Sequence, residues 1–230
     1  MRKKSIASWS ILAALLLCTA IAIASGGASG MKPDEALQKL MDGNKRYVEN
    51  AMGACAQTNT SLRDGLAKGQ KPYAIILSCS DSRVSPEIIF DKTLGEIFVV
   101  RVAGNIPDPI VLGSIEYAAE HLGSPLIMVL GHERCGAVTA AVDAKGKPEG
   151  NIGAIVKRIL PAVKEARKKC KDGDKPKLVE CAIDTNVAHV AKSLTSESKV
   201  IAHLVKEGKL QIVTAKYDLD DGKVTLFDKK

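Results

Sequence analysis

Aromatic residues are scarce in this chain of 230 residues. Phe, Trp and Tyr together make up 3% of it, and Trp9 is the one tryptophan. Proteins that bind single-stranded nucleic acid stack its bases on aromatic side chains, so this composition argues against that class. The sequence also lacks internal repeats and low-complexity tracts, which excludes repeat arrays. With 46% apolar and 26% charged residues, the chain is typical of one folded domain with a sizeable core.

Long apolar runs are also rare, and the run at residues 11–24 falls short of the ~20 residues that span a bilayer. Basic residues at 2–4 precede it, and Ala22-Ile23-Ala24 supplies small residues where a signal peptidase cuts. This pattern predicts a secretory signal over residues 1–24. We therefore expect residues 25–230 to be exported, periplasmic or secreted, as one domain without a membrane attachment.

Charge gives little indication of a partner. The net charge of +7 contains three basic residues of the expected signal, and much of the remaining surplus lies between residues 143 and 177. No nucleic-acid-binding motif accompanies that basic segment. We interpret it as a solvated helix face and loop, and expect no nucleic-acid partner.

Apolar runs bounded by turn residues predict strands at residues 73–78, 96–102, 126–130 and 210–219, and the last continues through an Asp221-Gly222 turn into a strand at 223–227. Helical spacing predicts helices at residues 34–48, in a polar segment before Gln70, and at 110–122, 151–169 and 199–206. This alternation predicts the α/β class: a single domain with a central, mostly parallel sheet flanked by helices, an N-terminal helical arm and a C-terminal hairpin.

Two polar segments each begin where a predicted strand ends. Cys79-Ser80-Asp81-Ser82-Arg83 follows the strand at 73–78, and His132-Glu133-Arg134-Cys135-Gly136 follows the strand at 126–130. Ligands gather at the carboxyl ends of parallel strands. Two thiolates and an imidazole suit tetrahedral Zn²⁺, and three protein ligands leave the open position of a catalytic zinc. Each residue alone would more simply be a buried core residue, but the three together favour a metal site.

In these motifs the sequence resembles the beta-class carbonic anhydrases. The family pattern CxDSR is present at residues 79–83, and HxxC followed by Gly-Ala at residues 132–137. The resemblance covers roughly residues 32–228, and at Val102 the chain departs from the Asn of many members. Further matches are Gly43-Asn44, Arg46, Gly69-Gln70, Pro72, residues 98–101, residues 103–105, residues 114–117, Asn186-Val187, residues 217–219 and Gly222.

The resemblance implies a zinc enzyme that hydrates carbon dioxide reversibly to bicarbonate and a proton through a zinc-bound hydroxide. One zinc per subunit would be held by Cys79, His132 and Cys135, with Asp81 and Arg83 as the catalytic dyad. The resemblance also implies a homodimer or higher even oligomer, in which the helix around residues 33–48 embraces the neighbour. The apolar side chains of this helix would then meet a partner or, equally, cap the core of their own chain. Its substrate pocket, formed in part by a second subunit, would include Gln70, Phe98, Ala103, Tyr117 and Gly136.

The sequence allows one alternative form of the zinc site and two alternative functions. Some members carry a regulatory form in which the dyad Asp ligates zinc, but that form uses a Trp where this chain has Ile76, although Arg101 matches its arginine. We therefore expect the open form at neutral pH. A hydrolase of carbon disulfide or carbonyl sulfide could use the same zinc. A non-catalytic bicarbonate sensor is disfavoured, because a structural site does not need Asp81 and Arg83.

Three cysteines of the expected mature chain lie outside the zinc motifs: Cys55, Cys170 and Cys181. An oxidising compartment permits one disulfide among them, and Cys170–Cys181 is favoured over the alternative that all three remain thiols. The other histidines, His121, His189 and His203, have no metal-binding partner at helical spacing. We expect them to be packing or surface residues.

Overall fold

A computed structural model describes residues 30–54, 58–146, 148, 150–171 and 174–227. The expected signal at residues 1–24, Cys55 and the centre of the loop before residue 174 lie outside the described residues. Cys170 and Cys181 form the favoured disulfide, which joins the end of one helix to the next helix. In the described part of the chain, no helix combines the length and apolar character needed to cross a membrane.

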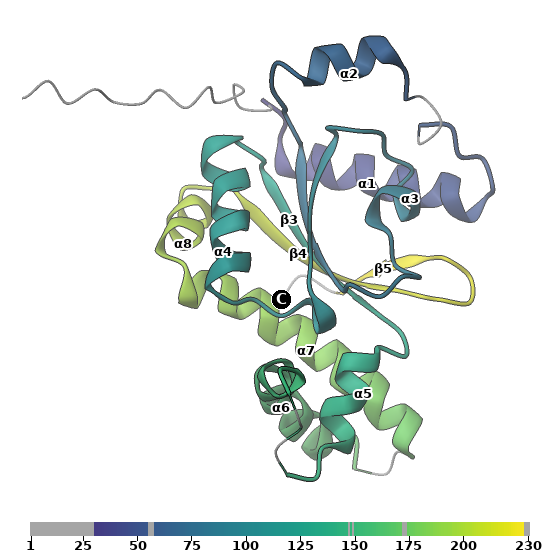
Figure 1. Ribbon diagram of the computed structural model, residues 1–230, viewed down its shortest axis with the longest axis vertical. Helices are drawn as coiled ribbons and strands as arrows, with labels where there is room; N and C mark the ends of the chain where they lie inside the picture. The colour runs from purple at the N-terminus through teal and green to yellow at the C-terminus, as the bar shows by residue number, and fades with distance from the viewer. Residues whose placement is uncertain (1–29, 55–57, 147, 149, 172–173, 228–230) are drawn as a thin grey trace, which may run out of the picture.

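A mixed five-stranded sheet forms the centre of the fold (Figure 1). Its strand order is β2-β1-β3-β4-β5, in which the first four strands are parallel and β5 is antiparallel. The prediction of a single α/β domain with a mostly parallel sheet and a terminal hairpin is confirmed. The strands are β1 (Ala74–Ser78), β2 (Ile97–Arg101), β3 (Leu126–His132), β4 (Gln211–Tyr217) and β5 (Val224–Leu226).

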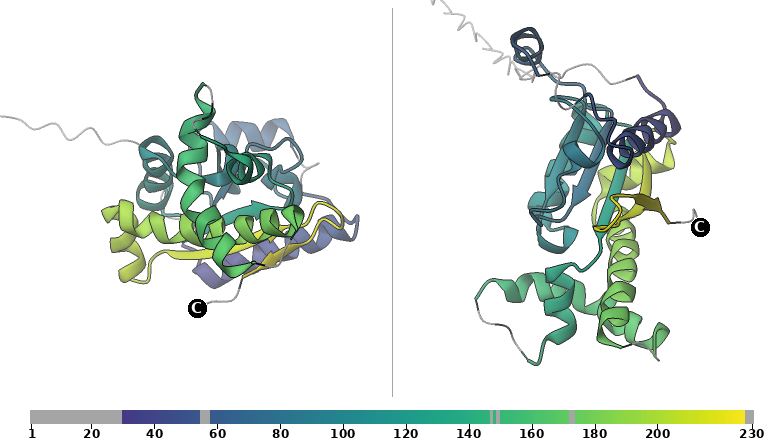
Figure 2. Two further views of the ribbon diagram at one scale, coloured as in Figure 1. Left: turned by 90° about the horizontal axis from the view of Figure 1, so that it is seen from below. Right: turned by 90° about the vertical axis from the view of Figure 1, so that its right-hand side faces the viewer.

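Helices cover both faces of the sheet (Figure 2). In β1, Ile76 packs into the cluster on the α1 and α3 side, while Ile75 and Leu77 pack into the cluster under α4, α7 and α8. This two-sided burial explains why residues 74–77 of β1 and 126–130 of β3 are uninterrupted apolar runs. The helices are α1 (Pro33–Val48), α2 (Thr60–Leu66), α3 (Pro86–Ile89), α4 (Pro109–Glu116), α5 (Gly136–Asp143), α6 (Ile152–Lys169), α7 (Lys175–Glu197) and α8 (Lys199–Lys206).

A third apolar cluster lies among α5, α6 and α7, at the end of the sheet where β1 and β3 finish (Figure 1). Val138 of α5, Ile159 of α6 and Ile183 of α7 belong to it, together with Cys79 and Cys135. The helices at the carboxyl edge of the sheet therefore bury the two cysteines of the expected metal site.

Near the functional segments the structure contains two helices that the sequence did not predict, α3 and α5, and it also moves the ends of two predicted elements. β3 continues to His132, because Gly131 and His132 pair with Lys216 and Tyr217 of β4. Gly131 interrupts the apolar run, so the sequence predicted that the strand ends at residue 130. The helix expected at 110–122 begins at Pro109 and finishes in a π-helical turn over Tyr117–His121.

The first helix packs on the core of its own chain. Leu40 is fully buried there, and the side chain of Asn44 donates hydrogen bonds to the carbonyls of Ile89 and Gly222 at 3.2 and 2.9 Å. Gly43 faces the backbone so closely that a Cβ atom would lie 1.8 Å from the carbonyl oxygen of Phe90. A glycine is therefore required where α1 meets the end of α3.

Gly43→Ala tests this close approach. We expect it to lower the free energy of unfolding by about 3 kcal/mol, the upper end of the usual cost of overpacking, because a backbone carbonyl has to move. Gly65→Ala in α2 is the control, since a Cβ atom there meets nothing within 4 Å, and it should raise stability by about 0.5–1 kcal/mol. Denaturant unfolding measures both. Equal effects of the two substitutions would contradict this account of α1.

Candidate metal centre and catalytic dyad

The structure brings Cys79, His132 and Cys135 together at the carboxyl edge of the sheet. Their candidate ligand atoms all lie within 4.8 Å of one another, and the two sulfur atoms are 4.0 Å apart. The cause is the pairing of β1 with β3, which places the ends of these neighbouring parallel strands side by side. Cys79 directly follows β1, His132 is the last residue of β3, and Cys135 caps the start of α5.

His132 is oriented for coordination through Nε2. Its Nδ1 atom lies 2.8 Å from the carbonyl oxygen of Glu133, so Nδ1 carries the hydrogen and donates it. Nε2 is then a free acceptor, and it has no hydrogen-bond partner although His132 is fully buried. An unsatisfied buried polar atom costs about 1–3 kcal/mol. A metal ion at Nε2 explains why this atom lacks a partner.

The pKa values of the two thiols are shifted in opposite directions. A hydrogen bond from Cys135 lowers the pKa of the Cys79 thiol, against the opposing effect of burial, and the Gly104 N–H donates to Cys79 Sγ at 3.3 Å. The hydrogen bond to Cys79 and burial raise the pKa of Cys135, although Ala137 and Val138 offer it N–H groups from the start of α5. A dication stabilises both as thiolates, and two thiolates with an imidazole are a donor set that suits zinc.

Asp81 and Arg83 form the expected pair beside this cluster. Arg83 Nε and Nη2 donate to the two carboxylate oxygens of Asp81 at 2.9 and 2.8 Å. These hydrogen bonds hold the pKa of Asp81 well below its usual range, and burial does not offset them. Asp81 Oδ2 also lies 3.9 Å from His132 Nε2. The site therefore keeps an ionised, oriented carboxylate next to the candidate ligands.

Arg101 holds the backbone of the first motif. From the end of β2 its Nε donates to the carbonyl of Cys79 at 2.9 Å, and its Nη2 donates to the carbonyl of Asp81 at 2.6 Å. In the sequence, Arg101 is only a match to a regulatory position, and these contacts are not predicted. They arise because Arg101 lies opposite Ser78 in the β1–β2 pairing, and Ser78 directly precedes Cys79.

Only two of the five expected pocket residues lie beside the cluster within one chain. Ala103 precedes Gly104, which contacts Cys79, and Gly136 follows Cys135. Gln70 precedes β1, and Phe98 pairs with Ile75 near the start of that strand. The five residues of β1 span roughly 15 Å, so those two positions are far from Cys79.

Tyr117 accompanies Phe98 rather than the candidate ligands. It follows α4, and its ring centroid lies 6.4 Å from that of Phe98. Within one chain, Gln70, Phe98 and Tyr117 therefore lie apart from the candidate ligands. The other histidines also lie away from the cluster, since His189 and His203 pair with carboxylates of Glu165 and Glu207.

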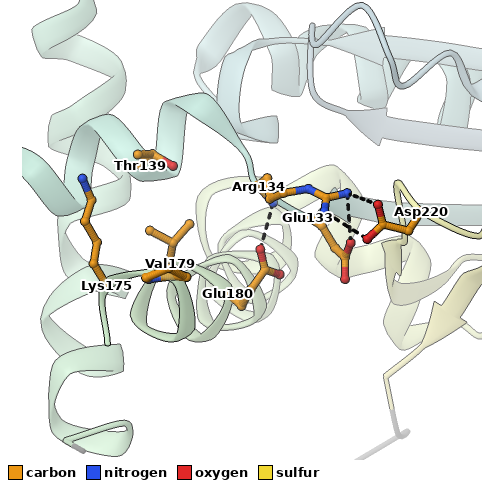
Figure 3. Close-up of a pocket in the computed structure, with 8 residues that line it drawn as sticks. Glu133, Arg134, Thr139, Lys175, Val179, Glu180 and Asp220 are labelled. Atoms are coloured by element: carbon orange, nitrogen blue, oxygen red, sulfur yellow. Dashed lines mark hydrogen bonds and ion pairs between the residues drawn. The ribbon is translucent and has the colours of Figure 1, made fainter. Parts of the chain in front are cut away.

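A second group of side chains that could hold a metal ion, Glu133, Asp218 and Asp220, follows the ends of β3 and β4. It borders a cavity of about 520 Å³ that Figure 3 shows. Arg134 already supplies a cation there, because it donates to both carboxylate oxygens of Asp220 at 3.0 and 2.9 Å. The buried cluster of two cysteines and a histidine is the better site for zinc.

Comparison with known proteins agrees with this geometry. The protein family described as carbonic anhydrase matches residues 74–224. The chain belongs to the carbonic anhydrase family. The chain is 42% identical over 199 residues to carbonic anhydrase 2 of Mycobacterium tuberculosis, which covers 85% of this chain and 93% of the relative. Identity is 40% over 197 residues to the carbonic anhydrase of Mycolicibacterium smegmatis, covering 84% and 93%.

The fold is that of the beta class. The solved structure of the β-carbonic anhydrase CafA from the fungal pathogen Aspergillus fumigatus matches with a TM-score of 0.69 and 26% identity, over 85% of this chain and 90% of that one. Zinc is the metal of β-carbonic anhydrases, and residues Cys79, His132 and Cys135 fit it by donor type, burial and spacing.

Metal content tests the choice between the two neighbouring groups. We expect the purified full-length chain to hold one zinc, measured by elemental analysis after removal of unbound metal. Cys135→Ser should lose it, because a neutral hydroxyl replaces a thiolate ligand. Asp220→Asn is the matched control and should retain one zinc. Retention in Cys135→Ser together with loss in Asp220→Asn would assign the metal to the acidic group instead.

Proposed function

We propose that this chain catalyses the reversible hydration of carbon dioxide to bicarbonate and a proton at the cluster of Cys79, His132 and Cys135. The observation that carries this proposal is the Asp81–Arg83 pair, which keeps an ionised carboxylate beside three zinc ligands that leave a fourth position open. The carbonic anhydrase names of the relatives at 42% and 40% identity support the same reaction.

The three ligands decide how strongly zinc acts. Zinc supplies Lewis acidity when bound, and carbonic anhydrases with three histidine ligands are the known case in which the pKa of a coordinated water falls to about 7. Here Cys79 and Cys135 contribute two negative charges where those enzymes have neutral imidazoles. These charges reduce the Lewis acidity of the bound zinc. A water molecule coordinated there would therefore ionise at a higher pH than in the enzymes with three histidine ligands.

Asp81 and Arg83 orient the nucleophile. A carboxylate that stays ionised only accepts hydrogen bonds, so Asp81 accepts a hydrogen bond from the attacking group. This contact orients a lone pair of the attacking oxygen toward the carbon of the substrate. Arg83 occupies both carboxylate oxygens, which opposes the use of Asp81 as a fourth metal ligand. The N–H of Gly136, at the start of α5, is the proposed donor to a substrate oxygen.

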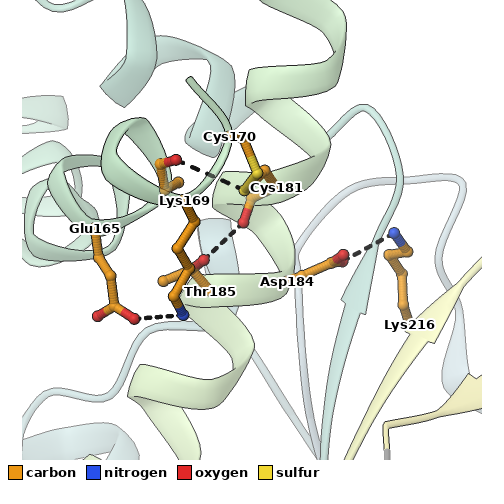
Figure 4. Close-up of a disulfide and its surroundings, with 8 residues drawn as sticks. Glu165, Lys169, Cys170, Cys181, Asp184, Thr185 and Lys216 are labelled. Carbon is orange, nitrogen blue, oxygen red and sulfur yellow. Dashed lines mark hydrogen bonds and ion pairs between the residues drawn. A yellow bond between two sulfur atoms is a disulfide. The ribbon is translucent and has the colours of Figure 1, made fainter. Parts of the chain in front are cut away.

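Export is part of the proposal. The signal-like pattern of residues 1–24 supports it, and so does the disulfide between Cys170 and Cys181 that Figure 4 shows at the α6–α7 junction. Disulfides persist in exported proteins and are rare in the cytosol. Residues 25–230 are accordingly the proposed mature, periplasmic or secreted enzyme.

A homodimer completes the proposed pocket. β2 is an edge strand of the sheet and is only half-buried, which leaves a ladder of backbone groups for a partner. Exposed apolar side chains lie on the helix beside it, with Ile110 81% exposed and Tyr117 37% exposed. A second chain on this side would cover these residues. It would also supply the expected pocket residues that one chain keeps away from its own cluster, of which Gln70 is the most remote.

Asp81→Asn tests the orienting role. We expect kcat for carbon dioxide hydration, measured by stopped flow, to fall by about 10²–10⁴-fold, because the amide loses the charge and one of the two acceptors. Zinc content should stay at one per chain, since Asp81 is not among the proposed ligands. Full activity in the variant would show that the Asp81–Arg83 pair is only structural.

Ile110→Glu tests the dimer. A buried charge on the α4 surface should shift the protein to monomers in sedimentation experiments and lower hydration activity at least tenfold, with zinc retained. The control is Ile152→Glu at the start of α6, which is 47% exposed on another part of the molecule. A monomeric wild-type protein with full activity would contradict the proposed assembly.

A further inference from the structure

One peptide group connects the imidazole of His132 to a carboxylate on α7. Glu133 and Arg134 separate His132 from Cys135. The peptide group that joins Glu133 to Arg134 makes two hydrogen bonds. Its carbonyl oxygen, from Glu133, accepts from His132 Nδ1 at 2.8 Å. Its N–H, from Arg134, donates to Glu180 Oε1 at 2.8 Å, as Figure 3 shows. The order of contacts is therefore carboxylate, peptide group, imidazole.

We propose that Glu180 is a positioning residue that acts on His132 through the Glu133–Arg134 peptide group and strengthens its hold on zinc. Histidines that bind metals commonly donate their second ring N–H to a carboxylate or a carbonyl, which fixes the ring and raises its basicity. Here the carbonyl of Glu133 accepts that hydrogen bond, and the N–H of the same peptide group donates to Glu180. The inference rests on the proposed function, because it takes His132 as a zinc ligand.

The physical basis is the polarisation of linked hydrogen bonds. An anionic acceptor on a peptide N–H draws the hydrogen toward itself and leaves more negative charge on the carbonyl oxygen of the same peptide. That oxygen then pulls more strongly on the His132 Nδ1 hydrogen. The imidazole gains electron density, and Nε2, the atom that faces the cluster, becomes a better donor to a metal.

The backbone conformation of the loop agrees with this role. Arg134 has a φ of 50°, in the left-handed region that a side chain of this size rarely adopts. Such conformations persist where surrounding contacts hold them, often at functional sites. Arg134 is held here by Asp220 through its side chain and by Glu180 through its N–H. The neighbouring Glu133 N–H donates to the carbonyl of Tyr217 at 3.1 Å, so the loop keeps anchors that do not depend on Glu180.

Nearby charges limit the size of the effect. Lys216 Nζ lies 3.5 Å from Glu180 Oε2 and 2.8 Å from Asp184 Oδ1, so the cation is shared between two carboxylates of α7. The Glu180 side chain is also 32% exposed, which lets solvent screen it. Direct outer partners of ligating histidines change metal affinity by about 10–100-fold. One peptide group further away, about tenfold is the expected size.

Three variants separate this role from that of a simple loop cap. Glu180→Gln keeps an oxygen that accepts from the Arg134 N–H but removes the charge. Glu180→Leu removes both the charge and the acceptor. Asp184→Asn is the matched control, because Asp184 lies one turn further along α7 and binds the same lysine without touching the peptide group.

The experiment follows zinc release from the zinc-loaded full-length chain into an excess of chelator, together with the proton resonance of His132 Nδ1–H. We expect E180Q to release zinc about tenfold faster than the wild type and to shift that resonance to higher field, as its hydrogen bond weakens. E180L should release zinc at least as fast as E180Q. D184N should release zinc within twofold of the wild-type rate, with the resonance unmoved.

Two results would overturn the inference. If E180L alone releases zinc faster while E180Q matches the wild type, Glu180 is only a cap for the loop. If neither variant differs from the wild type, Glu180 does not act on His132. Both results leave the proposed function intact provided that the wild-type chain binds one zinc and hydrates carbon dioxide. A wild-type chain that binds no zinc would instead refute the proposed function itself.

Discussion

The pairing of β1 with β3 is the constraint on which the site depends. Parallel neighbours end at the same edge of a sheet, and Ser78 of β1 lies opposite Leu130 of β3. Cys79 and His132 are thereby brought together from positions more than 50 residues apart in the chain. Both strands are buried throughout, so the hydrophobic burial that stabilises the sheet also fixes the relative position of these two side chains.

Neighbouring residues then stabilise the negative charge of the two cysteines and hold the loop of the first motif. Arg101 holds the carbonyls of the first motif, the Gly104 N–H points at Cys79 Sγ, and the start of α5 offers N–H groups to Cys135. These contacts come from β2, the segment after it and α5, all of which meet at the carboxyl edge. They have a common effect, since each stabilises negative charge or the loop that carries it. An apolar cluster among α5, α6 and α7 buries Cys79 and Cys135.

The sequence predicted the sheet and the candidate ligands for clear physical reasons. Strands buried on both faces are uninterrupted apolar runs. Two cysteines and a histidine near the ends of two such runs together make a donor set that suits zinc. The prediction failed where tertiary contacts decide the outcome. Pairing with Lys216 and Tyr217 extends β3 through Gly131 to His132, against the low strand propensity of glycine.

Contacts that depend on distant parts of the chain left no sequence signal. Glu180 is one carboxylate among many on helical segments, and only the packing of α7 against the 133–134 loop shows its role. Arg134 looks like a surface residue until its φ of 50° and its pairing with Asp220 are known. The sequence could favour a disulfide between Cys170 and Cys181 but could not establish it, because sequence does not give the separation of two Cα atoms.

X-ray absorption at the zinc edge of the metal-loaded protein tests the central claim most directly, because it counts the atoms around zinc by element and distance. The account predicts two sulfur atoms at about 2.3 Å and two nitrogen or oxygen atoms at about 2.0–2.1 Å, which are the imidazole and one exchangeable ligand. A spectrum with no sulfur, or with three or four sulfur atoms, would contradict it.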